Sequence, residues 1–197
     1  MRNTNAGHQA QWLRHCLGAV LISTLPFAAQ AGDFAISLTD DSAKGQLNFT
    51  NPSDELAFGL GYTYHNGSRH IGNLDFHAQG RTAIGNLPAT VGVGARAFYF
   101  RDSPVEGGAV GLGGYAAVNI PEVPGLTLNA SLHHAPTILS FSDSDGMTNL
   151  EATVGYRVIR NAEFFAGYRF LSTELEQPGT DDLRLDEGFL AGLRILF

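Results

Sequence analysis

The sequence predicts an all-β protein, an antiparallel up-and-down transmembrane β-barrel of ten strands, with eight strands as the alternative. Two observations lead to this prediction. Large apolar residues alternate with small or polar ones along most of the chain after residue 31, which is the two-residue period of a β-strand. No stretch keeps the 3.6-residue period of an amphipathic helix, and the 24 glycines follow no Gly-X-Y repeat.

The alternation is clearest in residues 56–64, where the even positions carry Leu, Phe, Leu, Tyr and Tyr and the odd positions carry Ala, Gly, Gly and Thr. It returns in 126–134, 150–158 and 189–197. Successive side chains of a strand point to opposite faces, so each segment would place its large apolar groups on one face. The expected strands are 33–40, 43–50, 55–65, 70–79, 89–101, 108–120, 126–136, 149–159, 162–173 and 186–197.

Most of these segments approach the ~9 to 11 residues with which a tilted strand crosses a bilayer. The first two segments have the weakest pattern, so eight strands stay possible, and an even number is expected for a closed bacterial barrel.

The predicted connections are of two kinds. Connections 51–54, 121–125 and 160–161 are short and rich in Pro, Asn and Gly, whereas 102–107, 137–148 and 174–185 are mostly longer and more acidic. Outer-membrane barrels have short periplasmic turns and longer outer loops. The connection 80–88 is expected to be an exception, long on the short side.

Residues 1–31 have the features of a secretory signal peptide. Two arginines precede an apolar stretch at 16–26, and Ala-Gln-Ala at 29–31 matches the small-x-small pattern that a signal peptidase reads. The apolar stretch is shorter than the ~20 residues of a transmembrane helix. We therefore expect export through the Sec pathway and a single domain at 32–197.

The composition narrows the classes of function. The formal net charge of -7 and the absence of a basic run argue against a nucleic-acid partner. The single cysteine, Cys16, lies in the predicted signal peptide, so the exported domain has no disulfide. Such a domain depends on its own core, on an oligomer or on a membrane for stability.

Alternation alone does not say which face is inside, and a secreted soluble barrel of the lipocalin kind would turn the apolar face inward around a ligand. Two features favour lipid outside. The face with the smaller residues also carries charges, which suit a narrow lumen. Aromatic residues also gather near the predicted strand ends, where they would form two interfacial girdles. These aromatic residues are Phe34, Phe49, Phe164 and Phe197 toward the turns, and Tyr64, Tyr99, Phe170 and Phe189 toward the loops.

A barrel of eight to ten strands has an interior about wide enough for side chains to fill, whereas open channels belong to barrels of about sixteen strands or more. Unpaired charges inside would be costly, so the inward charges should pair with one another. We expect a lumen largely plugged by ion pairs, with a narrow gated conduit as the alternative and at most weak conductance. The predicted lumen charge network comprises Asp75, Arg96, Glu151, Arg157, Arg169 and Arg194.

An enzyme is the second hypothesis, because Ser131, His133 and Glu151 share the predicted inner face on neighbouring strands. If that hairpin is symmetric, Glu151 would lie near His133, which gives a nucleophile, a base and an orienting group for a lipid-modifying hydrolase. A lipid would approach from outside, so a lumen hydrogen-bond cluster is the favoured interpretation. No catalytic residue, metal site or cofactor is assigned.

The last nine residues alternate apolar side chains and end in phenylalanine, and they resemble the C-terminal signal of substrates of the outer-membrane barrel assembly machinery. The residues that would form this signal are Phe189, Leu193, Ile195 and Phe197.

More narrowly, the chain resembles the YfaZ family of Gram-negative outer-membrane proteins, often described as porins. The resemblance rests on Leu-Gly-Tyr at 60–62, on Val-Gly-Val-Gly-Ala-Arg at 91–96, on the Gly-Tyr-Arg of 155–157 and 167–169, and on the terminal phenylalanine. It implies a Gram-negative outer-membrane barrel with a structural or minor channel-like role. The expected partners are outer-membrane lipid, lipopolysaccharide and the assembly machinery, and the expected state is a monomer.

Overall fold

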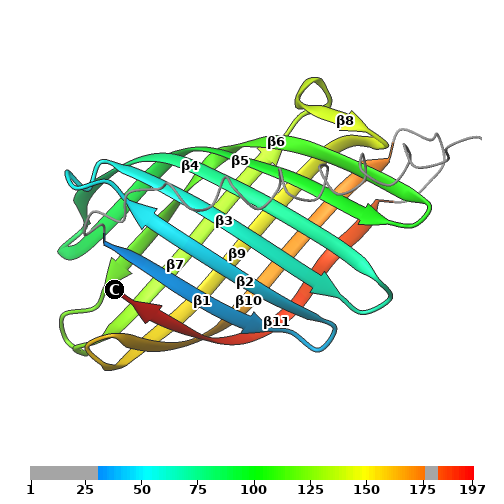
Figure 1. Cartoon of the computed structure of the whole chain (residues 1–197). Coiled ribbons are helices and arrows are strands. Elements are labelled where there is room, and N and C mark those ends of the chain that lie inside the picture. The colour runs from blue at the N-terminus through cyan, green and yellow to red at the C-terminus, as the bar shows by residue number, and fades with distance from the viewer. Residues whose placement is uncertain (1–30, 176–181) are drawn as a thin grey trace, which may run out of the picture.

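The computed structural model describes residues 31–175 and 182–197, which form a closed antiparallel β-barrel (Figure 1). Apart from Ala31, the predicted signal peptide lies outside the described residues. The elements are β1 (Gly32–Leu38), β2 (Ser42–Thr50), β3 (Leu56–His65), β4 (Arg69–Ile84), β5 (Leu87–Asp102), β6 (Val105–Asn119), β7 (Leu126–Ala135), η1 (Thr137–Leu139), β8 (Ser140–Ser142), β9 (Ser144–Ile159), β10 (Ala162–Leu175) and β11 (Leu183–Leu196).

Ten of these strands make the barrel wall. Each pairs antiparallel with the next, β7 pairs with β9, and β1 pairs with β11 to close the ring. The three-residue β8 pairs with the loop end of β6, at Gly107–Ala109, beyond the stretch of β6 that pairs with β7. The prediction of ten strands is confirmed, and the eight-strand alternative is wrong because β1 and β2 are both paired along both edges.

The ring closes next to the carboxyl terminus. The amide of Gly32 donates to the carbonyl of Phe197, and the amide of Phe197 donates to the carbonyl of Gly32, each at 3.0 Å. Without this pairing, the amides and carbonyls of Gly32 and Phe197 would lie at an open sheet edge, where unpaired backbone groups are unfavourable in a membrane.

The outer surface of the wall is apolar. Large side chains that alternate along the strands are exposed there, including Leu60 at 56%, Leu74 at 60% and Val93 at 69%. Residues between them face the interior and are mostly small, polar or charged. The alternative of a soluble ligand-binding barrel is therefore wrong, because it requires the apolar face inside. A barrel with an apolar outer band and a polar interior has the architecture of outer-membrane proteins.

Figure 1 shows two kinds of barrel end. We call the end that carries the connections after β2, β4, β6 and β9, with Gly32 and Phe197, the turn end. The opposite end is the loop end, which carries η1 and β8. The expectation of a long connection at 80–88 is wrong, because β4 and β5 continue past the other strands to the two-residue turn Gly85–Asn86, where Gly85 adopts a φ of 63°. A positive φ is favourable for glycine in such turns.

No helix within residues 31–175 and 182–197 is long and apolar enough to cross a membrane.

Candidate functional site

The first interior ion pair joins neighbouring strands near the middle of the barrel. Arg96 on β5 donates to both carboxylate oxygens of Asp75 on β4, from Nε at 2.6 Å and from Nη2 at 3.1 Å. The same carboxylate accepts the amides of Gln46 and Asn73, and the remaining Arg96 nitrogen, Nη1, donates to Asn149 at 2.9 Å. A bidentate ion pair with these additional hydrogen bonds holds both charged groups in fixed positions.

The second centre is Arg169 on β10, whose side chain is only 4% exposed. Its Nε donates to Glu151 at 2.8 Å, its Nη1 to Asp186 at 3.1 Å and its Nη2 to the Ser37 hydroxyl at 2.8 Å. The Lys44 ammonium lies 3.6 Å from the same Glu151 oxygen. Arg169 therefore connects β9, β10, β11 and β1 across the interior, because each guanidinium nitrogen has a partner on a different strand.

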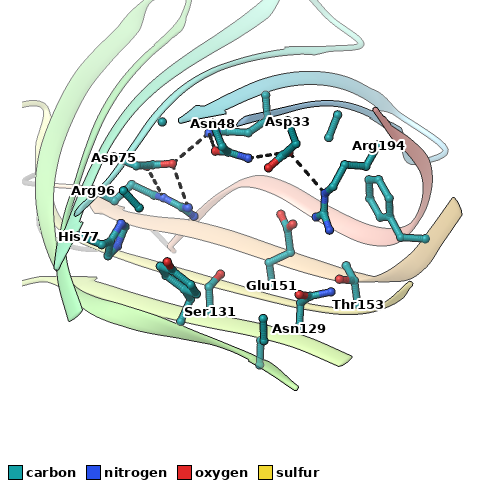
Figure 2. A pocket seen from close by; sticks show the side chains of 18 of the residues that line it. Asp33, Asn48, Asp75, His77, Arg96, Asn129, Ser131, Glu151, Thr153 and Arg194 are labelled. Atoms are coloured by element: carbon teal, nitrogen blue, oxygen red, sulfur yellow. Dashed lines mark hydrogen bonds and ion pairs between the residues drawn. The ribbon is translucent and has the colours of Figure 1, made fainter. Parts of the chain in front are cut away.

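The third pair lies nearer the turn end. Arg194 on β11 donates from Nη1 to Glu163 at 2.7 Å, and its Nε lies 3.5 Å from Asp33, an ion pair without a hydrogen bond. Its guanidinium stacks over the ring of Phe165, 5.2 Å from the centroid. Asn48 donates to Asp33 at 3.0 Å, so this carboxylate is held from two sides, as Figure 2 shows.

Glycine at two inward positions of β3 leaves the room that this network needs. A Cβ at Gly59 would lie 2.6 Å from the Asp75 carboxylate and 2.8 Å from the Gln46 amide nitrogen, and one at Gly61 would overlap the side chains of Asn73 and Gln46. Because these atoms belong to hydrogen-bonded groups, a side chain there would have to displace the network.

The loop end of the interior is filled by apolar side chains, which we call the apolar seal. Phe100 and Leu185 are fully buried, and the other members are at most 6% exposed. At the same end of the barrel, Arg69 pairs with Asp102 at 2.6 Å and donates to the backbone carbonyl of Leu185 at 2.7 Å. These contacts join β4, β5 and β11. The seal consists of Ile71, Phe98, Phe100, Ala109, Ala135, Met147, Leu171 and Leu185.

Between the ion pairs and the turn end lies a cavity of about 270 Å³, which we call the turn-side cavity. Its lining ranges from Ser37 and Arg169 in the middle of the barrel to Thr50 and Ala117 near the turn end. The members of the apolar seal are absent from this lining. The cavity therefore ends at the charged centre of the barrel, with the seal on the far side. Figure 2 shows the polar side chains that point into it.

The structure does not assemble the hydrolase candidates as a triad. Ser131 pairs in register with Glu151, and His133 pairs with Asn149, so Glu151 is a diagonal neighbour of His133 and not its direct cross-strand partner. The Glu151 carboxylate binds Arg169 and Lys44. His133 instead places its Nε2 2.8 Å from the Nε2 of His77 on β4. The histidine therefore has neither the nucleophile nor the orienting carboxylate as its partner.

Five of the six residues of the predicted charge network lie in ion pairs: Asp75 with Arg96, Glu151 with Arg169, and Arg194 with the additional partners Asp33 and Glu163. Arg157 is the exception. It is exposed near the turn end and has no ion pair within the part of the chain that the structure describes.

The prediction missed Asp33, Glu163 and Asp186 as acidic partners. The signal that could have found them is the same alternation. Asp33 follows the parity of the inward residues of β1, Glu163 that of Arg169 on β10, and Asp186 that of Arg194 on β11. The contact between His77 and His133 had no such signal, because these residues lie on strands that are distant in sequence.

The four residues of the predicted assembly signal lie on the outer face. Phe189, Leu193, Ile195 and Phe197 are exposed at 82%, 36%, 41% and 57%. As for metals, the residues described contain no group of three or more His, Cys, Asp or Glu side chains placed to hold an ion.

Comparison with known proteins identifies a family. The sequence profile described as "YfaZ precursor" matches residues 14–197. Among curated proteins, no match to the chain is found.

Solved structures similar to this chain include the following three. One, from work on the in-meso crystallization of membrane proteins, is 13% identical and has a TM-score of 0.43, with 85% of this chain and 83% of that chain covered. The KdgM porin in complex with disordered oligogalacturonate is 8% identical with a TM-score of 0.43, covering 85% and 99%. Pseudomonas aeruginosa OpdK with vanillate is 9% identical with a TM-score of 0.28, covering 81% and 56%.

Proposed function

Starting from the fact that the chain belongs to the YfaZ precursor family, we propose that it is a small structural barrel of the outer membrane with a closed interior. In this conformation the protein conducts ions weakly or not at all. Its role is that of a structural or minor channel-like component, and a narrow conduit would require the interior side chains to move.

The observation that carries this proposal is the pair of barriers stacked along the interior. The Arg169 centre joins four strands at mid-barrel, and the apolar seal with fully buried Phe100 and Leu185 lies on its loop side. An ion that entered would have to lose its hydration among side chains that are already paired, and then pass an apolar barrier. Ten strands leave an interior that such side chains can fill.

The proposed setting is the outer membrane of a Gram-negative bacterium, reached after export through the Sec pathway. The apolar outer face supports lipid and lipopolysaccharide as partners, and the outward residues of β11 support recognition by the barrel assembly machinery. A monomer is the proposed state, because within the described chain the ring of strands closes on itself and leaves no barrel edge to pair with a second copy.

Planar-bilayer recordings of the purified protein test this proposal. We expect no large, stable single-channel currents from the unmodified chain, and larger currents from a Phe100→Ala/Leu185→Ala variant with an emptied seal. The matched control is Leu74→Ala/Phe76→Ala, which removes similar volume from the outer face, where both residues are exposed. Large, stable currents from the unmodified protein would overturn the closed interior.

A further inference from the structure

We propose that the turn-side cavity is a binding site for a small, uncharged, polyhydroxylated solute of about monosaccharide size, taken up from the turn side of the barrel. The inference rests on the proposed function, because a blind cavity retains a solute that an open pore would pass. Four observations carry it: the pairing of the charges, the free polar groups, the aromatic lining and the size of the cavity.

The charges that line the cavity already have partners. Each of the seven charged residues in the lining lies in an ion pair, so no cation or anion is left over to bind a charged solute. A charged solute would have to bring its charge out of water without a free counter-charge, which is costly. The seven residues are Asp33, Lys44, Asp75, Arg96, Glu151, Arg169 and Arg194.

One wall of the cavity, by contrast, carries polar groups that are not engaged. The amide nitrogen of Asn129 on β7 is buried without a hydrogen-bond partner. The hydroxyls of Ser131 and Thr153 also make no hydrogen bond to another residue of the described chain. Asn129 pairs in register with Thr153, and Ser131 is two residues along the same strand, so the three groups form one continuous patch.

The patch faces a second polar wall. In a ring of ten strands, β7 lies on the side opposite β2, which contributes Asn48. Figure 2 shows Asn129, Ser131 and Thr153 along one side of the cavity and Asp33 with Asn48 along the other. Unengaged donors and hydroxyls are hydrated when a polar cavity is empty of solute, and the hydroxyls of a solute can replace that water.

Aromatic residues also line the cavity, among them Phe165 and Tyr115. Both are held by neighbours: Arg194 stacks over Phe165 at 5.2 Å, and Tyr115 packs edge-on against His77 with ring centroids 5.2 Å apart. The Tyr115 hydroxyl also donates to Gln79. Fixed apolar surfaces beside a few convergent polar groups are the usual composition of a small-molecule site. They suit a solute with both C–H faces and hydroxyls.

The volume sets the size of the solute. Pockets for drug-sized ligands occupy about 300–1,000 Å³, and the cavity of about 270 Å³ lies just below that range. It therefore has room for one small solute and excludes a chain of several sugar units.

Titration calorimetry on the full mature barrel in detergent micelles tests the inference. The neutral probes are D-glucose, D-galactose, D-mannose and myo-inositol, and the charged probes are D-gluconate and D-glucosamine. We expect saturable binding of at least one neutral probe and weaker or no binding of the charged ones. Absence of binding by all four neutral probes, or tighter binding of a charged probe, would overturn the inference.

Variants locate the binding. Asn129→Leu removes the free donor at similar size, and we expect roughly tenfold weaker binding, as for loss of a buried hydrogen-bond partner. Ala117→Phe fills the cavity and should abolish binding, whereas Ala152→Phe, the matched control on the exposed outer face, should not change it. Heat-modifiable migration in gels confirms that each variant is folded, and Asn129→Leu carries the test alone if Ala117→Phe does not fold.

Unchanged binding in the folded Asn129→Leu variant would place the solute elsewhere and contradict the inference. The two proposals fail separately. Large currents from the unmodified protein refute the closed interior whatever binds, whereas absence of binding in a protein without currents refutes only the cavity site.

Discussion

The Nε2 atoms of His77 and His133 lie 2.8 Å apart inside the barrel, on strands β4 and β7. Neither nitrogen can reach bulk water easily, since the two residues are 3% and 1% exposed. A contact this short requires one imidazole to donate its Nε2 proton to the lone pair of the other, so a single proton is shared at the contact. The pair links two sides of the barrel that are far apart in sequence.

We predict that either single substitution, His77→Leu or His133→Leu, lowers the free energy of unfolding by about 1–3 kcal/mol, because the remaining nitrogen loses its partner. The double variant should lose less than the sum of the two, because no orphaned nitrogen remains. Urea unfolding in micelles, followed by circular dichroism, gives the free energy of unfolding of the unmodified protein, the two single variants and the double variant. Strict additivity would show that the two rings do not interact.

A second prediction concerns Arg169, the centre of three polar contacts. Arg169→Met leaves the carboxylates of Glu151 and Asp186 without this partner, and Asp186 is only 2% exposed. Loss of one member of a buried ionic group costs about 3–5 kcal/mol. Urea unfolding should show a loss in this range.

The matched control for Arg169 is Arg81→Met, which breaks an ion pair with Asp54 in which the arginine is 83% exposed. Exposed pairs contribute about 0–1 kcal/mol, so this variant should unfold almost as the unmodified protein does. Equal losses for Arg169→Met and Arg81→Met would mean that the interior network contributes little stability.

The inward glycines give a third prediction. In Gly59→Ala the new methyl group would lie 2.6 Å from the Asp75 carboxylate, so the pair with Arg96 must shift. Overpacking of this kind costs about 1–3 kcal/mol. Gly72→Ala on the outer face of β4 meets nothing within 4 Å and should be neutral or slightly stabilising. Thermal unfolding of the two variants compares them directly, and equal midpoints would contradict the prediction.

A fourth prediction concerns biogenesis. Phe197→Ala keeps the two backbone hydrogen bonds to Gly32 that close the barrel. It should therefore refold in micelles like the unmodified chain, yet reach the outer membrane in several-fold lower amount if the assembly machinery reads this side chain. The ratio of folded to total protein in outer-membrane fractions measures the effect.

Phe164→Ala is the control for Phe197, because Phe164 is similarly exposed on the outer face of β10 at 58%. It should reach the membrane normally. Equal losses from both variants, or a refolding defect of Phe197→Ala in micelles, would assign the effect to general stability instead of recognition.

The local pattern of the sequence determined the wall of this protein. A period of two fixes which side chains share a face, and it gave ten strands, their approximate bounds and the apolar outer surface. Residues 80–88 resemble a loop in sequence because of Gly85 and the residues after it. In the structure, cross-strand pairing extends β4 and β5 through this segment to a two-residue turn. Backbone pairing with a neighbour is not visible in a single segment.

Only the tertiary structure decided the interior. Alternation placed Asp75, Arg96 and Arg169 inside, and the register of neighbouring strands paired Asp75 with Arg96 and Glu151 with Arg169. Closure of the ring added partners from strands distant in sequence, Ser37 for Arg169 and Lys44 for Glu151. The register of β7 and β9 set Glu151 opposite Ser131, whereas closure of the ring joined His133 to His77 and gathered Phe100 and Leu185 into the apolar seal. The sequence of a strand shows on which face each residue lies. The order, register and tilt of the strands determine the height of that residue in the barrel and the partner of its side chain.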